Sequence, residues 1–442
     1  MADGTHGASK QNKGGDYSSI EIGNLNKQLA ASIIGKVDSV PPSTFKKTCC
    51  IYRVHEKFRK INKYAYTPDT VAIGPFHRGE ERLKAMEEQK LRYVHGLLAR
   101  ITTMPEKKME ECVEAMRKLE EKARKCYSEP INLDGNEFLE MLLVDGLFIV
   151  ELFRKSSGDV RTGRDDPIFN TAWGMASIVR DMILIENQLP MFVLERLFNL
   201  TTVPNEGGRS LNLLALLFLN SLMPRDEKVL QTCSNCEGKH LLDLIGNTFQ
   251  ALPRVMEEPH SNRKFMPHTL PRVMEEPHSN QTWKFMPCVT ELRQAGVKFK
   301  RGSTTGSFLD IKFSNGVLEI PPVLIQDQTE TLLRNLIASE QCYNRYATCI
   351  TSYAFLMDSL INSADDVKYL CHHEIIINYL GEDEDVASLF NKLCNEVTLV
   401  NFYYAKIVVK YMDVPCHLIK WHDLCEWLIQ AMTIDPKVSV DG

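Results

Sequence analysis

The sequence predicts a mainly α-helical protein, a large multi-helix globular body with one small β-hairpin at about residues 307–325. Apolar residues recur three or four positions apart over most of the chain, which is the period of a helix packed on one side. Two runs of alternating apolar and polar residues flank Ser314–Asn315–Gly316, a turn sequence that favours a hairpin. The composition, 44% hydrophobic and 25% charged over 442 residues, is typical of soluble globular proteins.

The periodicity places the helices in order along the chain. The first begins near Glu80, where one face carries Leu83, Met86, Leu91, Val94, Leu98 and Ile101. The second begins at Pro105, because proline suits the first turn of a helix. Others are predicted over 136–155, 171–188, the stretch after Pro190, 211–222, 240–249, 328–342, 345–363, 364–380 and 383–397.

The domain organisation follows from composition. Residues 1–40 are polar and glycine-rich at their start, so we predict a disordered N-terminal tail. Residues 41–415 form a single domain, and 416–442 form a divergent C-terminal tail. The domain is interrupted at 252–287, where LPRVMEEPHSN occurs twice among six prolines. Proline removes a main-chain donor, so this duplicated segment is predicted to be a surface loop.

Charge and motif content narrow the function. The 52 basic and 57 acidic residues are well mixed and give a net charge of −5, so no nucleic-acid partner is expected. No apolar stretch reaches the roughly 20 residues that span a membrane. The 13 cysteines are scattered, which indicates a reducing compartment. No nucleotide-binding, hydrolase or kinase motif occurs, so we expect no enzyme activity and no cofactor.

Four polar residues interrupt the apolar stretch 180–198: Asp181, Glu186, Asn187 and Gln188. A helix must end before Pro190, and a helix end leaves main-chain groups unpaired. We therefore predict that these side chains complete main-chain hydrogen bonds at a junction between two buried helices. The alternative is a hydrolase or transferase whose novel site is built on Asp181, Glu186 and Asp145, another acid in an apolar stretch.

Cys233, Cys236 and His240 have the spacing of half a zinc site. A closed site needs a fourth ligand, and none lies nearby at metal-like spacing. A redox motif of the thioredoxin type needs a strand–helix context that is missing here. We therefore predict no metal site, with a zinc-stabilised binding module as the alternative.

Several stretches in this order resemble a plant family known as domain of unknown function 247, or UPF-type uncharacterised plant proteins. They are IYRVHEKFRKINKYAYTPDTVAIGPFHRG (51–79), MEEQK (86–90), FLEMLLVDGLFIVELF (138–153), DMILIENQLPMFVLERLF (181–198), ATCITSYAFLMDSLINSADDV (347–367) and GEDEDVASLFNKLC (381–394). TELRQAGVKFK and LDIKFSNGVLEIPP are also similar to the family. The chain departs from it at His55, where proline is usual, and in the 252–287 insertion.

The resemblance implies a largely helical protein, with no activity, cofactor or catalytic residue to carry over. Members typically end in a membrane-spanning helix, which implies the cytosolic face of the plasma membrane. Here residues 416–442 contain no long apolar helix, so we expect that anchor to be missing and this form to be cytoplasmic. Some grass members are linked to pollen self-incompatibility. We therefore expect a non-enzymatic plant protein that recognises an unknown protein partner at or near a membrane.

Overall fold

The computed structural model describes residues 19–39, 49–171, 173–202, 208–251, 286–304, 306–342 and 348–412. The chain divides into two compact units, Met1–Cys49 and Cys50–Gly442. The described part is mainly α-helical, as predicted, with a few short strands in the second unit.

The described part of the first unit is a helix in the segment predicted to be a disordered tail. Helix α1 spans Ser19–Ser39. Leu25, Leu29 and Ile33 recur every four residues along it, and 51–61% of each side chain is exposed. A local helical pattern therefore accounts for α1, since these side chains are not buried in a core. Residues 1–18 lie outside the described part.

The second unit contains the other helices. Those before the strands are α2 (Glu56–Ile61), the 3-10 helices η1 (Tyr64–Tyr66) and η2 (Glu81–Leu83), α3 (Lys84–Ile101), α4 (Pro105–Arg124), α5 (Gly135–Ser156), α6 (Pro167–Asn170), α7 (Gly174–Asp181), α8 (Met191–Thr201), α9 (Leu211–Leu219), α10 (Glu227–Cys233), α11 (Leu241–Ala251) and α12 (Val289–Gln294). Those after them are α13 (Thr329–Cys342), α14 (Cys349–Leu360), α15 (Ala364–His372), α16 (Asp383–Leu393) and α17 (Ala405–Met412).

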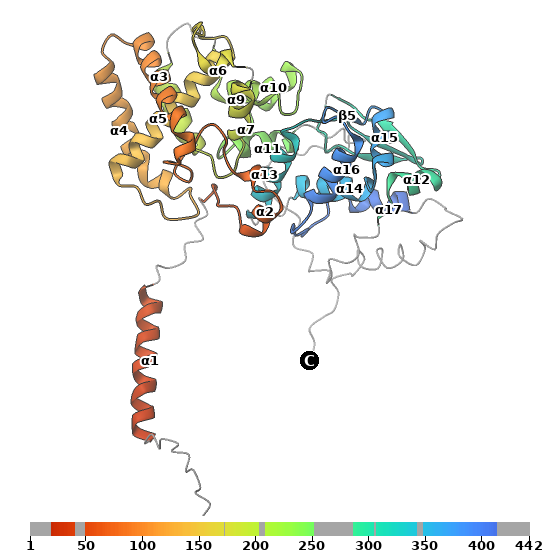
Figure 1. Ribbon diagram of the computed structural model, residues 1–442, viewed down its shortest axis with the longest axis horizontal. Coiled ribbons are helices and arrows are strands. Elements are labelled where there is room, and N and C mark those ends of the chain that lie inside the picture. Colours follow the sequence, from red (N-terminus) through yellow and green to blue (C-terminus); the bar gives the residue numbers. More distant parts are fainter. Residues whose placement is uncertain are drawn as a thin grey trace, which may run out of the picture. The chain divides into compact units, whose positions relative to one another are not determined.

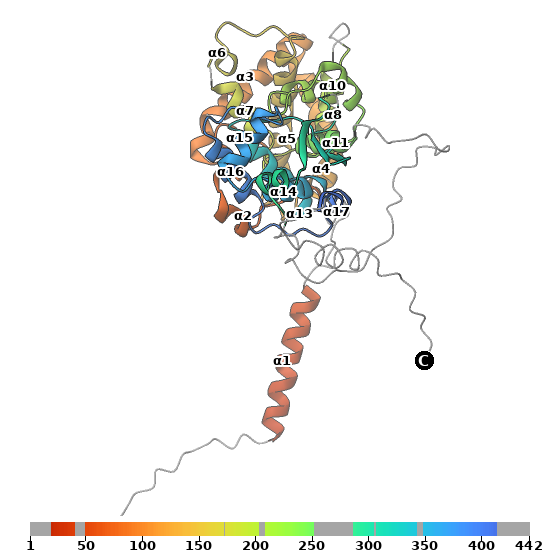
Figure 2. The ribbon, with the colours of Figure 1, turned by 90° about the vertical axis from the view of Figure 1, so that its right-hand side faces the viewer.

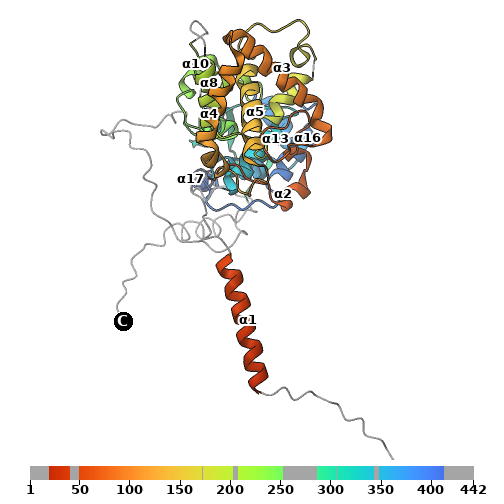
Figure 3. The same cartoon turned by 90° about the vertical axis from the view of Figure 1, so that its left-hand side faces the viewer.

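Helix α5 is the central helix of the second unit. It matches the helix predicted over 136–155 and begins with a capping box, in which Asp134 and Glu137 each bind the other's main-chain amide. It packs against α3, α4, α8 and α9. Almost every residue from Phe138 to Phe153 is buried, so α5 is enclosed on several sides. Figure 3 shows α3, α4 and α5 on the same side of the body.

The strands confirm the predicted hairpin and add pairings that the sequence did not indicate. Strands β2 (Lys312–Ser314) and β3 (Val317–Ile320) are antiparallel. Asn315 and Gly316 turn between them with φ values of 51° and 73°. The hairpin is shorter than predicted. Strand β1 (Lys298–Arg301) pairs parallel with β3, and β4 (Val323–Ile325) pairs parallel with β5 (Ile376–Asn378).

The helix predicted over 364–380 was too long. Helix α15 ends at His372, and Glu374 turns the chain with a φ of 55°. The next residues form β5, because Ile376 is buried where it pairs with Val323 of β4. This partner lies about 50 residues away, so the local helical period could not reveal it.

The elements of the second unit gather in two groups. Figures 1 and 2 place the strands and helices α12 and α14–α17 on the side of the body away from α3 and α4. Helices α11 and α13 contact each other; α11 also contacts α9, and α13 also contacts α14 and α16. These two helices therefore link the groups.

Two predicted segments fall on residues that are not described. The duplicated loop, over 252–285, lies outside the described ranges, and so does the C-terminal tail 416–442. Within the described ranges, no helix combines the length and the apolar character needed to cross a membrane.

Burial along α5 and exposure on α3 predict effects of very different size for the same truncation. Leu152 of α5 is fully buried, whereas 55% of Leu91 on α3 is exposed. We expect Leu152→Ala to lower the free energy of unfolding by about 2–5 kcal/mol, because it leaves a cavity. Leu91→Ala should change it by less than about 0.5 kcal/mol. Urea unfolding followed by circular dichroism measures both, and equal effects would contradict this assignment of the core.

Candidate functional site

The carboxylate of Asp181 holds a distant stretch of main chain. Helix α7 ends at Asp181, earlier than the predicted residue 188. Its carboxylate oxygens accept hydrogen bonds from the amides of Asp69 at 3.0 Å, Thr70 at 2.6 Å and Val71 at 2.9 Å. Arg180 Nη1 lies 2.8 Å from the same carboxylate. Asp181 is fully buried, so this acid is satisfied by main-chain donors and one cation.

Asn187 and Gln188 complete the turn between α7 and α8. Asn187 Oδ1 accepts from the amide of Ile73 at 2.7 Å, and its Nδ2 donates to the carbonyls of Val71 and Asp181. Gln188 Nε2 donates to the carbonyls of Met182 and Leu184 at 2.7 and 2.9 Å. Both side chains are 1% exposed. The prediction that they complete main-chain hydrogen bonds at a junction before Pro190 is confirmed.

Glu186 lies beside two arginines and a histidine. Its Oε1 accepts from the amide of Val54 at 2.5 Å. Its Oε2 lies at ion-pair distances from two arginines, 2.5 Å from Arg59 Nη2 and 3.5 Å from Arg53 Nη1, and 3.3 Å from His77 Nε2. Burial alone would raise the pKa of Glu186, but His77, the Val54 amide and Arg59 together lower it below its ordinary value.

Asp145 pairs with Lys90, which was not among the predicted site residues. Lys90 Nζ lies 2.7 Å from Asp145 Oδ1 and also binds the carbonyl of Ala72, and both charged side chains are 1% exposed. The other oxygen of Asp145 accepts from the amide of Gly74 at 2.8 Å. Burial raises the pKa of Asp145, and the charge of Lys90 opposes that rise. Lys90 lies between Met86 and Val94 on the predicted buried face of α3, which signals a buried ion pair.

Gly74 is required where the 69–74 segment meets the α7–α8 turn. Its φ is +73°, and a Cβ atom there would lie 2.7 Å from the carbonyl oxygen of Gln188. No residue with a side chain fits this close approach without a shift of the main chain. The 69–74 segment is therefore fixed by both steric fit and hydrogen bonds.

The three candidate catalytic acids are each engaged in the interior. Asp145 and Asp181 bind amides of the 69–74 segment, and Glu186 binds the amide of Val54. Their side chains are at most 1% exposed. A catalytic acid must reach a substrate atom. Here a substrate would have to displace main-chain donors first, so the geometry favours a structural role for all three.

His240 does not join Cys233 and Cys236 in a zinc site. It is fully buried, its Nε2 lies 2.9 Å from the carbonyl of Cys50, and its Nδ1 accepts from the amide of Asp243 at 3.2 Å. Both ring nitrogens therefore bind main chain. In the described ranges no three His, Cys, Asp or Glu side chains are arranged to hold a metal ion. The zinc-module alternative built on these three residues is wrong.

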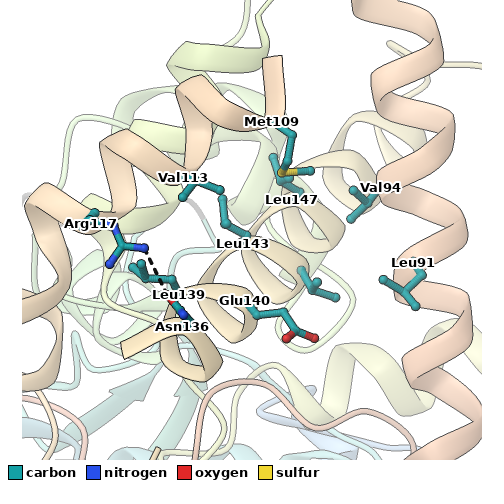
Figure 4. Close-up of a pocket in the computed structure, with 11 residues that line it drawn as sticks. Leu91, Val94, Met109, Val113, Arg117, Asn136, Leu139, Glu140, Leu143 and Leu147 are labelled. Atoms are coloured by element: carbon teal, nitrogen blue, oxygen red, sulfur yellow. Dashed lines mark hydrogen bonds between the residues drawn. The ribbon is translucent and has the colours of Figure 1, made fainter. Parts of the chain in front are cut away.

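A second candidate site is an apolar hollow on the surface, which we call the α3–α5 groove. Its volume is about 370 Å³, near the lower end of the roughly 300–1,000 Å³ range of ligand pockets. Leu139, Leu143 and Leu147 recur every four residues of α5 and form its floor. Figure 4 shows the α4 wall and the α3 wall on opposite sides of this floor. The lining residues are Leu91, Val94, Met109, Val113, Arg117, Asn136, Leu139, Glu140, Leu143, Val144 and Leu147.

Polar groups lie at one end of the groove. Arg117 Nη2 donates to Asn136 Oδ1 at 3.1 Å, as the dashed line in Figure 4 marks. Glu140 is exposed and lies 3.7 Å from Arg78. The sequence pattern does not reveal the groove, because the helical period places Leu91 on a buried face, whereas this side chain is 55% exposed. Exposed apolar side chains beside a hollow floor indicate a binding surface.

The ion cluster of Glu186 predicts a pH-dependent loss of stability. Glu186→Gln should lower the free energy of unfolding at pH 7 by about 3 kcal/mol, because it leaves Arg59 beside an uncharged partner in the interior. The pKa of Glu186 in the folded state lies below its ordinary value of 4.5. As the pH falls, the unfolded state therefore binds a proton at Glu186 before the folded state does. The stability that the wild type has over Glu186→Gln is complete above pH 4.5 and disappears below the pKa of Glu186 in the folded state.

Urea unfolding of both proteins between pH 7 and about pH 3 measures this difference. Glu129→Gln is the matched control, because Glu129 pairs with Arg53 at the surface with 52% of its side chain exposed. Glu129→Gln should lower the free energy of unfolding by less than about 1 kcal/mol. A Glu186→Gln loss that is equal at every pH would contradict the ion-pair assignment.

A UPF0481 protein of Arabidopsis thaliana is 33% identical over 391 residues, which cover 86% of this chain and 79% of the relative. A second UPF0481 protein of the same plant is 24% identical over 430 residues, covering 80% of this chain and 79% of the relative. No solved structure matches. Residues 51–439 match the family DUF247, described as "Plant protein of unknown function", and the chain belongs to this plant family.

Proposed function

We propose that this protein acts without catalysis, as a recognition protein that binds an amphipathic helix of a partner protein in the α3–α5 groove. One observation carries the proposal: an apolar hollow whose floor lies on the buried helix α5 and whose wall carries the exposed side chain of Leu91. The floor leucines at positions i, i+4 and i+8 of α5 span about 12 Å along the helix axis. Recognition of a helix in a groove uses apolar side chains at this same spacing.

The electrostatics of the groove favour one kind of partner. The floor and both walls are apolar, so the partner helix needs leucine-like or aromatic side chains along one face. At the end of the groove, the guanidinium of Arg117 is bonded to a neutral amide, that of Asn136. An acidic side chain on the partner would pair with Arg117 and fix the direction in which the helix lies.

The buried acids support a role without catalysis. Asp145, Asp181 and Glu186 are each tied to main-chain amides in the interior. The location at or near a plant membrane, and the recognition role that the family resemblance implies, are part of the same proposal. Fractionation of plant cells, with an alkaline wash of the membranes, tests the location, because it separates integral, peripheral and soluble protein.

A matched pair of surface variants tests the groove. Leu91→Glu places a charge on the groove wall, whereas Val400→Glu places the same charge at another exposed apolar residue, one that is 68% exposed. Proximity labelling in plant cells, followed by affinity measurement with each labelled partner, compares the two variants. Binding should weaken at least about tenfold with Leu91→Glu, because burying an unpaired charge costs more than 1.4 kcal/mol.

Val400→Glu should bind every partner as the wild type does. A photo-reactive amino acid at position 91 then identifies the bound segment, which should be an amphipathic helix with an acidic residue. Partners that bind Leu91→Glu and the wild type equally would overturn the proposal. Unchanged circular dichroism of both variants shows that a loss of binding does not come from unfolding.

A further inference from the structure

Two thiols meet where α10 ends. Helix α10 ends at Cys233, and the amide of Cys236 donates to the carbonyl of Cys233 at 2.9 Å, which closes a tight turn. The two thiols hydrogen-bond each other. Cys233 is 2% exposed, whereas Cys236 is partly exposed. The turn thus brings two cysteines together, one buried and one partly exposed.

The surrounding residues fix this turn from two sides. Asn212 Nδ2 of α9 donates to the carbonyls of Ser234 and Cys236 at 3.3 and 3.1 Å. The guanidinium of Arg225 lies close enough to both thiols to interact with their charge. Thr248 holds this guanidinium by a hydrogen bond of 2.8 Å, and the ring of Phe249 lies 5.0 Å from it. The Nε atom of Arg225 is buried and has no hydrogen-bond partner among the described residues.

We propose that Cys233 and Cys236, with Arg225 beside them, form a redox site that a small hydroperoxide such as hydrogen peroxide oxidises to a reversible disulfide. The thiolate of Cys233 attacks one peroxide oxygen and forms an S–O bond, which makes the sulfenic acid. The O–O bond breaks, and the other oxygen leaves as hydroxide and takes a proton to form water. The thiol of Cys236 then attacks the sulfenic sulfur and releases a second water. Two thiols are oxidised, and one peroxide is reduced to two waters.

The geometry suits each step. A thiolate is the reactive form of cysteine, and a cation beside it stabilises that form. The hydrogen bond from Cys236 outweighs burial, and with the charge of Arg225 it lowers the pKa of Cys233 to about 7. Cys233 is 2% exposed and lies beside the partly exposed Cys236, so the proposed oxidant is a small one, hydrogen peroxide. The second thiol is already in contact, so the sulfenic acid has a partner within the same turn.

A second thiol pair provides an internal comparison. The thiols of Cys50 and Cys126 also hydrogen-bond each other, but the two residues are only 2% and 5% exposed. Both members of this pair are buried, whereas Cys236 of the first pair is partly exposed, so Cys50 and Cys126 should stay reduced under conditions that oxidise Cys233 and Cys236. Selectivity between two hydrogen-bonded pairs in one chain therefore tests the role of exposure and of Arg225.

Mass spectrometry after differential alkylation tests the proposal on the full reduced chain. Hydrogen peroxide at neutral pH should remove two hydrogens from the peptide with Cys233 and Cys236, and dithiothreitol should restore them. In Cys236→Ser the sulfenic acid of Cys233 should persist and react with dimedone. Arg225→Gln, which keeps both sulfurs, should slow oxidation at least about tenfold at neutral pH, because it removes the charge beside the thiolate.

Three outcomes would overturn the proposal. In the first, the Cys233–Cys236 peptide stays reduced while a small dithiol in the same solution is oxidised. In the others, Cys50 and Cys126 are oxidised as fast as Cys233 and Cys236, or Arg225→Gln is oxidised as fast as the wild type. Circular dichroism identifies any variant that has not folded. If Cys236→Ser fails to fold, the wild-type selectivity and the Arg225→Gln rate decide the matter.

Discussion

The interior of this protein depends on the capture of main-chain amides by buried polar side chains at the end of α7. Three consecutive amides, those of Asp69, Thr70 and Val71, point at the single carboxylate of Asp181. The 69–74 segment has no helix or strand of its own in which to satisfy these groups. An unpaired buried amide costs free energy comparable to a lost hydrogen bond. The segment can therefore enter the core only because an acid is there to receive it.

The same network connects parts of the second unit that are far apart in sequence. The amide of Ile185, in the turn after α7, donates to Asn335 of α13 at 3.0 Å, and Asn335 donates in turn to the carbonyl of Ala65 at 2.6 Å. The amide of Leu242, at the start of α11, donates to Gln188 Oε1 at 3.3 Å. Because α11 and α13 also contact the helices on either side of them, the α7–α8 turn lies where the two groups of elements join. A structural role for these polar residues explains why so many of them converge there.

The sequence could predict what depends on neighbours along the chain. The period of α5, the turn at Asn315–Gly316 and the helix start after Pro190 all follow from local patterns, and the structure has each of them. The end of α7 at Asp181 and the change from α15 to β5 depend on partners more than 50 residues away, and both predictions were wrong. The groove and the contact between Cys233 and Cys236 depend on side-chain positions, which periodicity does not specify. Lys90 was a local signal of a buried ion pair, since a charge on an apolar face needs a partner.

The central claim is that Asp181 serves the main chain rather than a substrate, and hydrogen exchange of single amides tests it most directly. In the wild type the amides of Thr70 and Val71 should exchange slowly. In Asp181→Asn they should exchange at least about tenfold faster, since a hydrogen bond to a charged group contributes about 1.5–3 kcal/mol. Amides in the middle of α5 should stay protected in both proteins. Rapid exchange of Thr70 and Val71 in the wild type, or unchanged protection in the variant, would contradict the account.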